Sequence, residues 1–193
     1  MTLDEAFAKV PTFTTGRLVL RPMEPGDAEA IFEIKGDPGV TECYAAEPHA
    51  TRDQTRKWVE DRLDGYRERK SIWWMYNLKE QSRVIGSCCY WHIDEESRCA
   101  EIGYELNRAY WHQGISSEAL VPILEYGFDG MGLNRIEACP FAENASSNRL
   151  LQNLGFKLEG TLRQRVWFRG RFLDQHYYGL LKGEFKPLRA ASP

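Results

Sequence analysis

The chain has 193 residues, carries a net charge of −3 at pH 7, and contains apolar and charged residues in the proportions of an ordinary globular protein. This length fits one domain with a complete hydrophobic core, so we interpret residues 1–193 as a single domain. The acidic balance offers no basic surface for a phosphate backbone, and we expect no nucleic-acid partner.

Cysteine usage and the N-terminal segment indicate the compartment. The five cysteines are odd in number and lack C-x-x-C spacing, which argues against a disulfide framework or a zinc site. Charged residues interrupt the N-terminal segment, and no stretch approaches the roughly 20 apolar residues of a membrane span. We therefore expect a reduced, cytoplasmic protein with no metal site and no membrane partner.

The first third of the chain alternates between loosely patterned and periodic segments. Residues 1–13 show little pattern, and we interpret them as a loose arm. Apolar residues alternate with polar ones over 17–23, which predicts a strand. Helical spacing predicts helices at 28–34 and at 52–69, with an irregular segment at 40–51 between them.

The middle of the chain predicts three strands and then a central helix. The strands cover 71–78, 83–93 and 99–106, in the order of a hairpin meander rather than of repeated strand–helix units. Small and apolar residues then repeat at the spacing of one helical face from Gly114 to about residue 131. Because this apolar face continues past Pro122, we expect the proline to kink the helix rather than break it.

The last third predicts a short strand, a helix and a final set of strands. The short strand covers 134–139, and Asn144 caps a helix that ends at Gly155. The remaining strands are expected at 156–162, 166–168 and 172–181, with a turn at 169–171 and a frayed tail at 186–193. Together the elements predict an α+β fold, with a mixed, mostly antiparallel sheet of about seven strands and about four helices.

The start of the central helix is suited to an anion. Its first backbone N–H groups lack helical partners and lie at the positive end of the helix dipole. Gly114 allows close approach, and Ser116 and Ser117 add hydroxyl donors, so a phosphate or pyrophosphate fits. The stretch is neither a Walker loop nor a dinucleotide fingerprint, since it has no lysine and one glycine. Glu118 stands where a nucleophile elbow requires its second glycine.

Four stretches of the chain resemble, in order, the GCN5-related N-acetyltransferase (GNAT) superfamily in its RimJ/RimL branch. They are 15–22, 100–104, 111–116 and 143–156. The branch is named for enzymes that acetylate the N-termini of ribosomal proteins. The resemblance implies a GNAT fold and an enzyme that transfers an acetyl group from acetyl-CoA to a primary amine, by direct attack in a ternary complex. Trp111 and Ser116 depart from the usual pyrophosphate motif.

The resemblance also implies which residues contact acetyl-CoA. It places the pantetheine arm along Tyr104, Leu106 and Asn107, and it implies a hydrogen bond from Asn144 to a pantetheine amide. The residues implied for the pyrophosphate are His112, Gln113, Gly114, Ile115, Ser116 and Ser117.

Acetyl transfer needs a base, because most primary amines are protonated near neutral pH. Glu101 and Glu105 lie four residues apart on one strand and so share a face, where burial would raise their pKa. We favour Glu101, which stands at the acidic position of the family motif, although both could be ordinary charges on a half-exposed strand. His92 and His176 are alternative bases, but an isolated histidine on a strand is more often structural.

The resemblance implies Ser147 as the proton donor to the departing thiol, although the residue could simply belong to the helix cap. Leu151 stands where the superfamily usually has a tyrosine that acts as the general acid, and Val166 stands where RimL-like sequences have an acidic residue that acts as the base. These departures leave a non-enzymatic CoA-binding module as an alternative function.

The amine acceptor stays open between two classes. The branch favours a protein or peptide N-terminus, and a small molecule such as an amino acid, a polyamine or an antibiotic is the alternative. The sequence does not distinguish a monomer from a homodimer.

Overall fold

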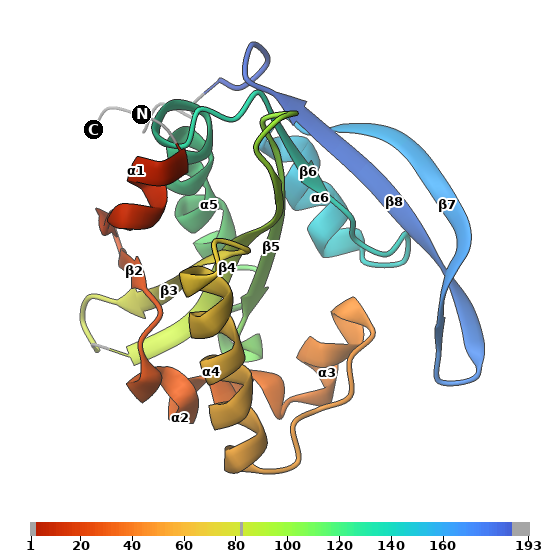
Figure 1. Cartoon of the computed structure of the whole chain (residues 1–193). Helices are drawn as coiled ribbons and strands as arrows, with labels where there is room; N and C mark the ends of the chain where they lie inside the picture. The colour runs from red at the N-terminus through yellow and green to blue at the C-terminus, as the bar shows by residue number, and fades with distance from the viewer. Residues whose placement is uncertain (1–2, 82, 187–193) are drawn as a thin grey trace.

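The computed structural model describes residues 3–81 and 83–186, and these form an eight-stranded sheet in the order β1-β2-β3-β4-β5-β6-β8-β7 (Figure 1). The strands are β1 (Phe13–Thr14), β2 (Leu18–Pro22), β3 (Ile72–Leu78), β4 (Arg83–Asp94), β5 (Cys99–Leu106), β6 (Arg135–Ala138), β7 (Lys157–Phe168) and β8 (Arg171–Leu181). All neighbours are antiparallel except β5 and β6, which are parallel. The predicted mixed α+β fold is confirmed, with β1 as an additional strand.

Six α-helices occur within the described residues, two more than the sequence predicted. They are α1 (Leu3–Ala8), α2 (Ala28–Lys35), α3 (Pro38–Thr41), α4 (Arg52–Arg67), α5 (Ile115–Glu125) and α6 (Ala145–Asn153). Short 3-10 turns cover Pro25–Asp27, Glu42–Tyr44 and Arg108–Tyr110, and a π-helical turn covers Tyr126–Gly130. Of the described helices, none has the length and apolarity needed to cross a bilayer.

The interpretation of residues 1–13 as a loose arm is wrong. Leu3 and Ala6 on α1 are buried in the main core, because their spacing of three gives even this short helix an apolar face. The Tyr66 hydroxyl donates to the Phe7 carbonyl, and the Trp74 indole donates to the Pro11 carbonyl at 3.0 Å. The predicted tail lies, beyond residue 186, outside the described residues.

Helix α3 lies at the start of the segment interpreted as irregular. Asp37 caps it by accepting a hydrogen bond from the Gly39 amide at 2.8 Å, and Pro38 occupies its first turn, where a missing N–H costs nothing. A single turn of helix has too few periodic positions to stand out from the sequence.

The helices cover the sheet on both faces (Figure 1). Helices α2 and α4 pack on β3 and β4 through a small apolar cluster, whereas α5 packs against the opposite face in the main core. Helix α5 is not broken at Pro122. It leaves α geometry four residues later in the π-helical turn, next to the Ile123 carbonyl that accepts a hydrogen bond from the Tyr90 hydroxyl at 2.9 Å.

The parallel strands β5 and β6 part after three residue pairs. The last pair joins Glu101 to Glu137, and beyond it β5 has no pairing with β6 as far as Leu106. The chain after β6 instead stays bonded to β8. The Cys139 carbonyl accepts a hydrogen bond from the Gln175 side chain at 2.8 Å, and the Pro140 carbonyl accepts one from the His176 backbone N–H at 2.9 Å. The edge of β5 is therefore open between Glu101 and Leu106.

The strands β7 and β8 form a long hairpin that projects from the rest of the sheet (Figure 1). Its predicted turn is confirmed at Arg169 and Gly170, whose φ angles of 46° and 81° suit a two-residue hairpin loop. The Arg169 guanidinium forms a 3.0 Å ion pair with Glu47, in the segment that follows α3. This ion pair joins the tip of the β7–β8 hairpin to the segment that follows α3.

Substituting Gly127→Ala should destabilise the fold at the π-helical turn. An added Cβ would meet the Tyr90 hydroxyl and would lie 2.9 Å from the Ile136 side chain, both in the core. Overpacking of this kind costs about 1–3 kcal/mol, which urea unfolding would detect. Gly26→Ala is the matched control, because nothing lies within 4 Å of its added Cβ. Equal stability of the two variants would contradict the packing described here.

Candidate active site

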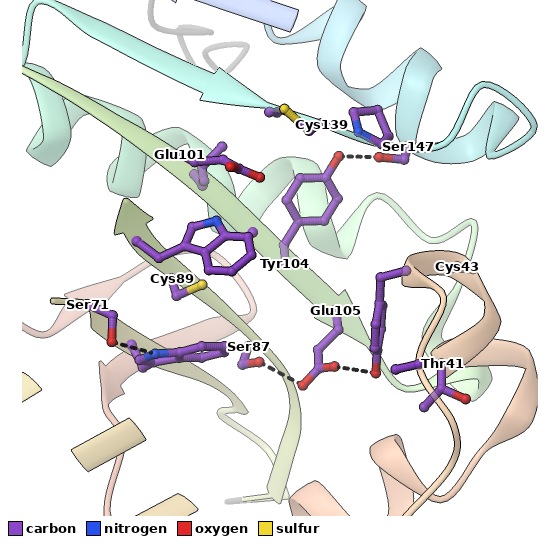
Figure 2. A pocket seen from close by; sticks show the side chains of 18 of the residues that line it. Thr41, Cys43, Ser71, Ser87, Cys89, Glu101, Tyr104, Glu105, Cys139 and Ser147 are labelled. Atoms are coloured by element: carbon purple, nitrogen blue, oxygen red, sulfur yellow. Dashed lines mark hydrogen bonds between the residues drawn. The ribbon is translucent and has the colours of Figure 1, made fainter. Parts of the chain in front are cut away.

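A cavity of about 820 Å³ opens where β5 and β6 part. Its walls come from α2, α4, the central strands and the start of α6 (Figure 2). Among the residues predicted for the site, it brings together Glu101, Tyr104, Glu105, Asn144 and Ser147. The predicted pyrophosphate residues do not line it and lie at the start of α5. Figure 2 shows Glu101 and Tyr104 near Cys139 and Ser147, with Glu105 farther along β5 toward Thr41.

Glu101 is the buried carboxylate at the parting of the strands. Its side chain is 18% exposed, and burial raises its pKa above the ordinary value for glutamate. A hydrogen bond of 3.1 Å between Glu101 Oε2 and His92 Nδ1 opposes this shift, whereas the nearby Glu137 adds to it. A carboxylate with a raised pKa and one histidine partner is suited to accept and release a proton near neutral pH.

His92 reaches Glu101 because β4 is irregular there. The register between β4 and β5 shifts after Trp91, and His92 takes a left-handed backbone conformation with φ of 46°. Its ring stacks on Trp91 with centroids 4.3 Å apart, and its side chain is 69% exposed. The sequence had made His92 an alternative base, and the structure makes it the partner of the favoured one.

Glu105 has a different environment from Glu101. Its carboxylate forms a 2.8 Å ion pair with Lys35 and accepts hydrogen bonds from Tyr44 at 3.0 Å and Ser87 at 3.2 Å. The Lys35 and Glu105 side chains are 8% and 7% exposed, and the Lys35 ammonium also lies 4.3 Å from the ring centre of Trp58. With three donors on its two oxygens, Glu105 is held as a structural anion rather than left free to act as a base.

Lys35 is the functional-site residue that sequence reasoning missed. It is the last residue of α2, where a lysine normally interacts with the helix dipole and with solvent. Its partner lies 70 positions away on β5, so no local pattern connects the two. Only the packing of α2 onto the sheet brings them together.

Tyr104 and Ser147 form a pair of hydroxyl groups on the other side of the cavity. Their oxygens are 2.7 Å apart, and either can be the donor. Asn144 caps α6 by accepting a hydrogen bond from the Ser147 backbone amide at 3.1 Å, as the sequence predicted. Leu151, where the superfamily usually has tyrosine, is fully buried. Burial raises the pKa of Tyr104 to about 12, so its hydroxyl is protonated at neutral pH.

Two other positions weighed from the sequence lie in structural settings. Val166 packs with Phe168 and Leu173 in the small core of the hairpin. His176 forms a 2.7 Å hydrogen bond with Asn148, which agrees with its structural interpretation. Within the described residues, no cluster of three histidine, cysteine, aspartate or glutamate side chains could hold a metal ion.

The start of α5 fits a pyrophosphate. Gly114 has φ of 72°, and the nearest atom to an added Cβ there is a guanidinium nitrogen of Arg17 at 3.7 Å, so the approach to the backbone is open. Arg17 donates to the Gln113 carbonyl at 2.9 Å and pairs with Glu118 at 2.6 Å. The structure thus places an Arg17–Glu118 ion pair, absent from the sequence prediction, beside the N–H groups of the first turn.

Leu106 and Asn107 build the turn that leads into this helix. The Leu106 carbonyl accepts from the Trp111 indole at 2.8 Å, and the Asn107 side chain accepts from the Ala109 amide at 3.0 Å. The Asn107 amide donates to the Ile85 carbonyl at 2.8 Å. Since these groups already have partners, the open edge of β5 near Tyr104 is better placed for a pantetheine arm.

Comparison with known proteins agrees with the fold. The family model described as acetyltransferase (GNAT) domain matches residues 17–157. An uncharacterised N-acetyltransferase, p20 of Bacillus licheniformis, is 39% identical, over 90% of this chain and 98% of its own. A GNAT-family acetyltransferase structure from Bacillus anthracis has a TM-score of 0.79 at 28% identity, over 90% of this chain and all of its own.

A further likeness concerns the fold alone. The structure of RimL, a ribosomal L7/L12 α-N-protein acetyltransferase in complex with coenzyme A, has a TM-score of 0.81 at 19% identity, over 89% of this chain and 98% of its own. The family match covers well over half of the chain. The chain therefore belongs to the GNAT family of acetyl-CoA-dependent N-acetyltransferases.

Proposed function

We propose that this enzyme acetylates the N-terminal amine of a protein or peptide, by direct attack of the amine in a ternary complex with acetyl-CoA. The observation that carries the proposal is the position of Glu101. This carboxylate, with its pKa raised by burial, shares one cavity with the Tyr104 and Ser147 hydroxyls at the parting of β5 and β6.

Acetyl-CoA supplies the acyl group as an activated thioester. The first-turn amides from Ile115 to Ser117, together with Gly114, would hold its pyrophosphate, with His112, Gln113 and the Arg17 guanidinium beside them. The open edge of β5 would pair with the pantetheine arm, and Asn144 would hydrogen-bond one of its amides. Burial of Ile115 orients the first turn, so its contribution is its backbone N–H.

Glu101 removes the proton that prevents the amine from attacking. The proton moves to the carboxylate, directly or through water, and the 3.1 Å hydrogen bond to the exposed His92 offers a route to solvent. The raised pKa suits this exchange, because a carboxylate of ordinary pKa would be a weak base near pH 7. Glu105 contributes by holding Lys35 and the cavity floor in place.

Ser147 donates a proton as the thiolate departs. The Tyr104 hydroxyl, 2.7 Å away, orients the serine and can replace its proton. This pair provides on β5 and α6 what a tyrosine at the position of Leu151 provides elsewhere in the superfamily. This half-buried pair would therefore supply the proton that the missing tyrosine would otherwise donate.

A peptide acceptor is supported by the extent of the cavity. It reaches from Glu101 across β4 and β3 to the side chains of α4, which gives room for several residues beyond the amine.

The proposal is tested by measuring acetyl-CoA consumption, followed as free thiol, with short peptides and with small amines as acceptors. Turnover on peptides is expected. Turnover on small amines alone would show that the acceptor is a small molecule instead of a peptide.

The pH profile should identify the base. His92→Phe keeps the ring that stacks on Trp91 but removes the hydrogen bond that lowers the Glu101 pKa. The Glu101 pKa should therefore rise, and the acid limb of kcat/KM for one fixed peptide should move to higher pH. Glu101→Gln should lower kcat/KM by about 10²–10⁴-fold below the pKa of the amine, with a smaller loss above it. An acid limb unmoved in both variants would rule out Glu101.

Ser147→Ala should lower kcat while leaving the dissociation constant of CoA nearly unchanged, because the serine acts on the departing thiol. A loss of roughly 10²-fold is expected from one general acid. Tyr104→Phe should cause a smaller loss in kcat, since Ser147 remains. Stopped-flow turnover and calorimetric CoA titration measure the two quantities. An unchanged kcat in Ser147→Ala would assign the proton donor elsewhere.

A further inference from the structure

The charges that line the cavity are almost all paired within the protein. Six of its charged side chains, in five pairs, have a partner of opposite charge or a histidine within 3.2 Å. The pairs are Lys35 with Glu105, Glu47 with Arg169, Asp61 with Lys57, Lys70 with Glu68 and Glu101 with His92. Arg62 is the remaining charged residue of the lining. Within residues 3–81 and 83–186, no carboxylate forms an ion pair with it.

Arg62 is held on an aromatic platform. Its guanidinium carbon lies 4.6 Å from the Trp58 ring centre and 5.8 Å from the Trp73 ring centre, and these rings meet edge to face at 5.1 Å. Stacking uses the face of a guanidinium and leaves its N–H groups free to bind a carboxylate in bidentate fashion. A weakly hydrated cation with free donors in a cavity wall is a site for an anion.

The cavity provides no competing negative surface near Arg62. His49, which lines the same wall, has its pKa lowered by burial, by Lys35 and by Arg62, so it is neutral at pH 7. Asp61 is held by Lys57 at 3.2 Å. A polyamine acceptor would need several unpaired carboxylates along its length, and the paired lining shows the opposite arrangement.

The spacing between Trp73, which lies under the Arg62 guanidinium, and the strand that carries Glu101 indicates where the anion would lie along an acceptor. Trp73 is in register with Cys89, and Cys89 with Gly103, so Trp73 lies two strands from β5 on the face that also carries Glu101. Two strand spacings amount to roughly 10 Å. An extended peptide advances about 3.3 Å per residue, so a side chain near its third residue spans this distance. The carboxylate of a free amino acid is too close to its own amine to do so.

We propose that Arg62 recognises an acidic side chain near the third residue of the acceptor, so that the enzyme prefers acidic peptide N-termini. This specificity rests on the proposed N-terminal acetyltransferase function and names its substrate class. The aromatic platform positions the guanidinium, and Glu101 receives the amine at the other end of the same bound segment.

The test compares peptides that differ at one position. Ser-Ala-Glu-Ala-Gly-Tyr and its Ser-Ala-Gln and Ser-Ala-Lys counterparts are assayed for kcat/KM with the full-length chain. The wild type should prefer the glutamate peptide over the glutamine peptide by roughly tenfold, the size expected for one charge-assisted pair. Arg62→Gln should bring this ratio close to one, and Arg62→Lys should keep part of it, because lysine retains the charge without the fork.

Arg67→Gln is the matched control on the same helix. Arg67 is paired with Asp64 and does not line this cavity, so this variant should keep the wild-type ratio. A wild-type ratio of one, or a preference for the lysine peptide, would overturn the proposal while leaving the acetyltransferase function intact. Loss of the preference in Arg67→Gln would also overturn it.

A binding measurement separates this inference from the proposed function. Each peptide is titrated into the protein in the presence of CoA, and tryptophan fluorescence is measured. Trp58 and Trp73 should respond to binding, because they contact Arg62. Selective binding of the glutamate peptide, lost in Arg62→Gln, would support the anion site even if no peptide were acetylated. Equal binding of all three peptides would overturn it whether or not turnover occurred.

Discussion

The site depends on one discontinuity in the sheet, the parting of β5 from β6 after Glu101. The chain beyond β6 follows β8, and Pro140 in that segment has no N–H to offer β5. An open strand edge inside a sheet would normally be a defect, because its backbone groups lack partners. Here the opening makes the cavity, and it leaves Glu101 buried at the last paired position, where desolvation raises its pKa.

The same strand carries two glutamates that the fold places in different environments. Glu105 receives three donors and one buried cation, so its charge is balanced inside the protein. Glu101 has one exposed histidine as its partner and stays exchangeable with solvent. Breaking a buried pair strands a charge at a cost of several kcal/mol, so Glu105 is poorly suited to repeated proton transfer. The environment of each carboxylate, rather than its residue type, distinguishes the proposed base Glu101 from the ion-paired Glu105.

The sequence predicted what local patterns encode. Strand alternation, helical spacing and turn residues located seven of the eight strands and four of the six helices, and the motif around Gly114 located the start of α5. These local patterns could not predict contacts between distant segments. Examples are Lys35 with Glu105, Tyr104 with Ser147 and Arg17 with Glu118, which are 70, 43 and 101 positions apart. Helix α1 was missed because a helix of six residues gives little apolar periodicity in the sequence.

The balance of charges in the cavity bears on how an acceptor is chosen. A paired side chain can bind a substrate only if its internal partner is released, which costs free energy before any contact is gained. Selectivity is therefore expected from groups whose donors are already free and whose position is already set. Arg62, held on Trp58 and Trp73, meets both conditions, whereas Lys35, although deeper in the cavity, does not. Preorganisation thus places substrate choice at the rim contributed by α4 and leaves the buried floor to maintain the geometry of the strands.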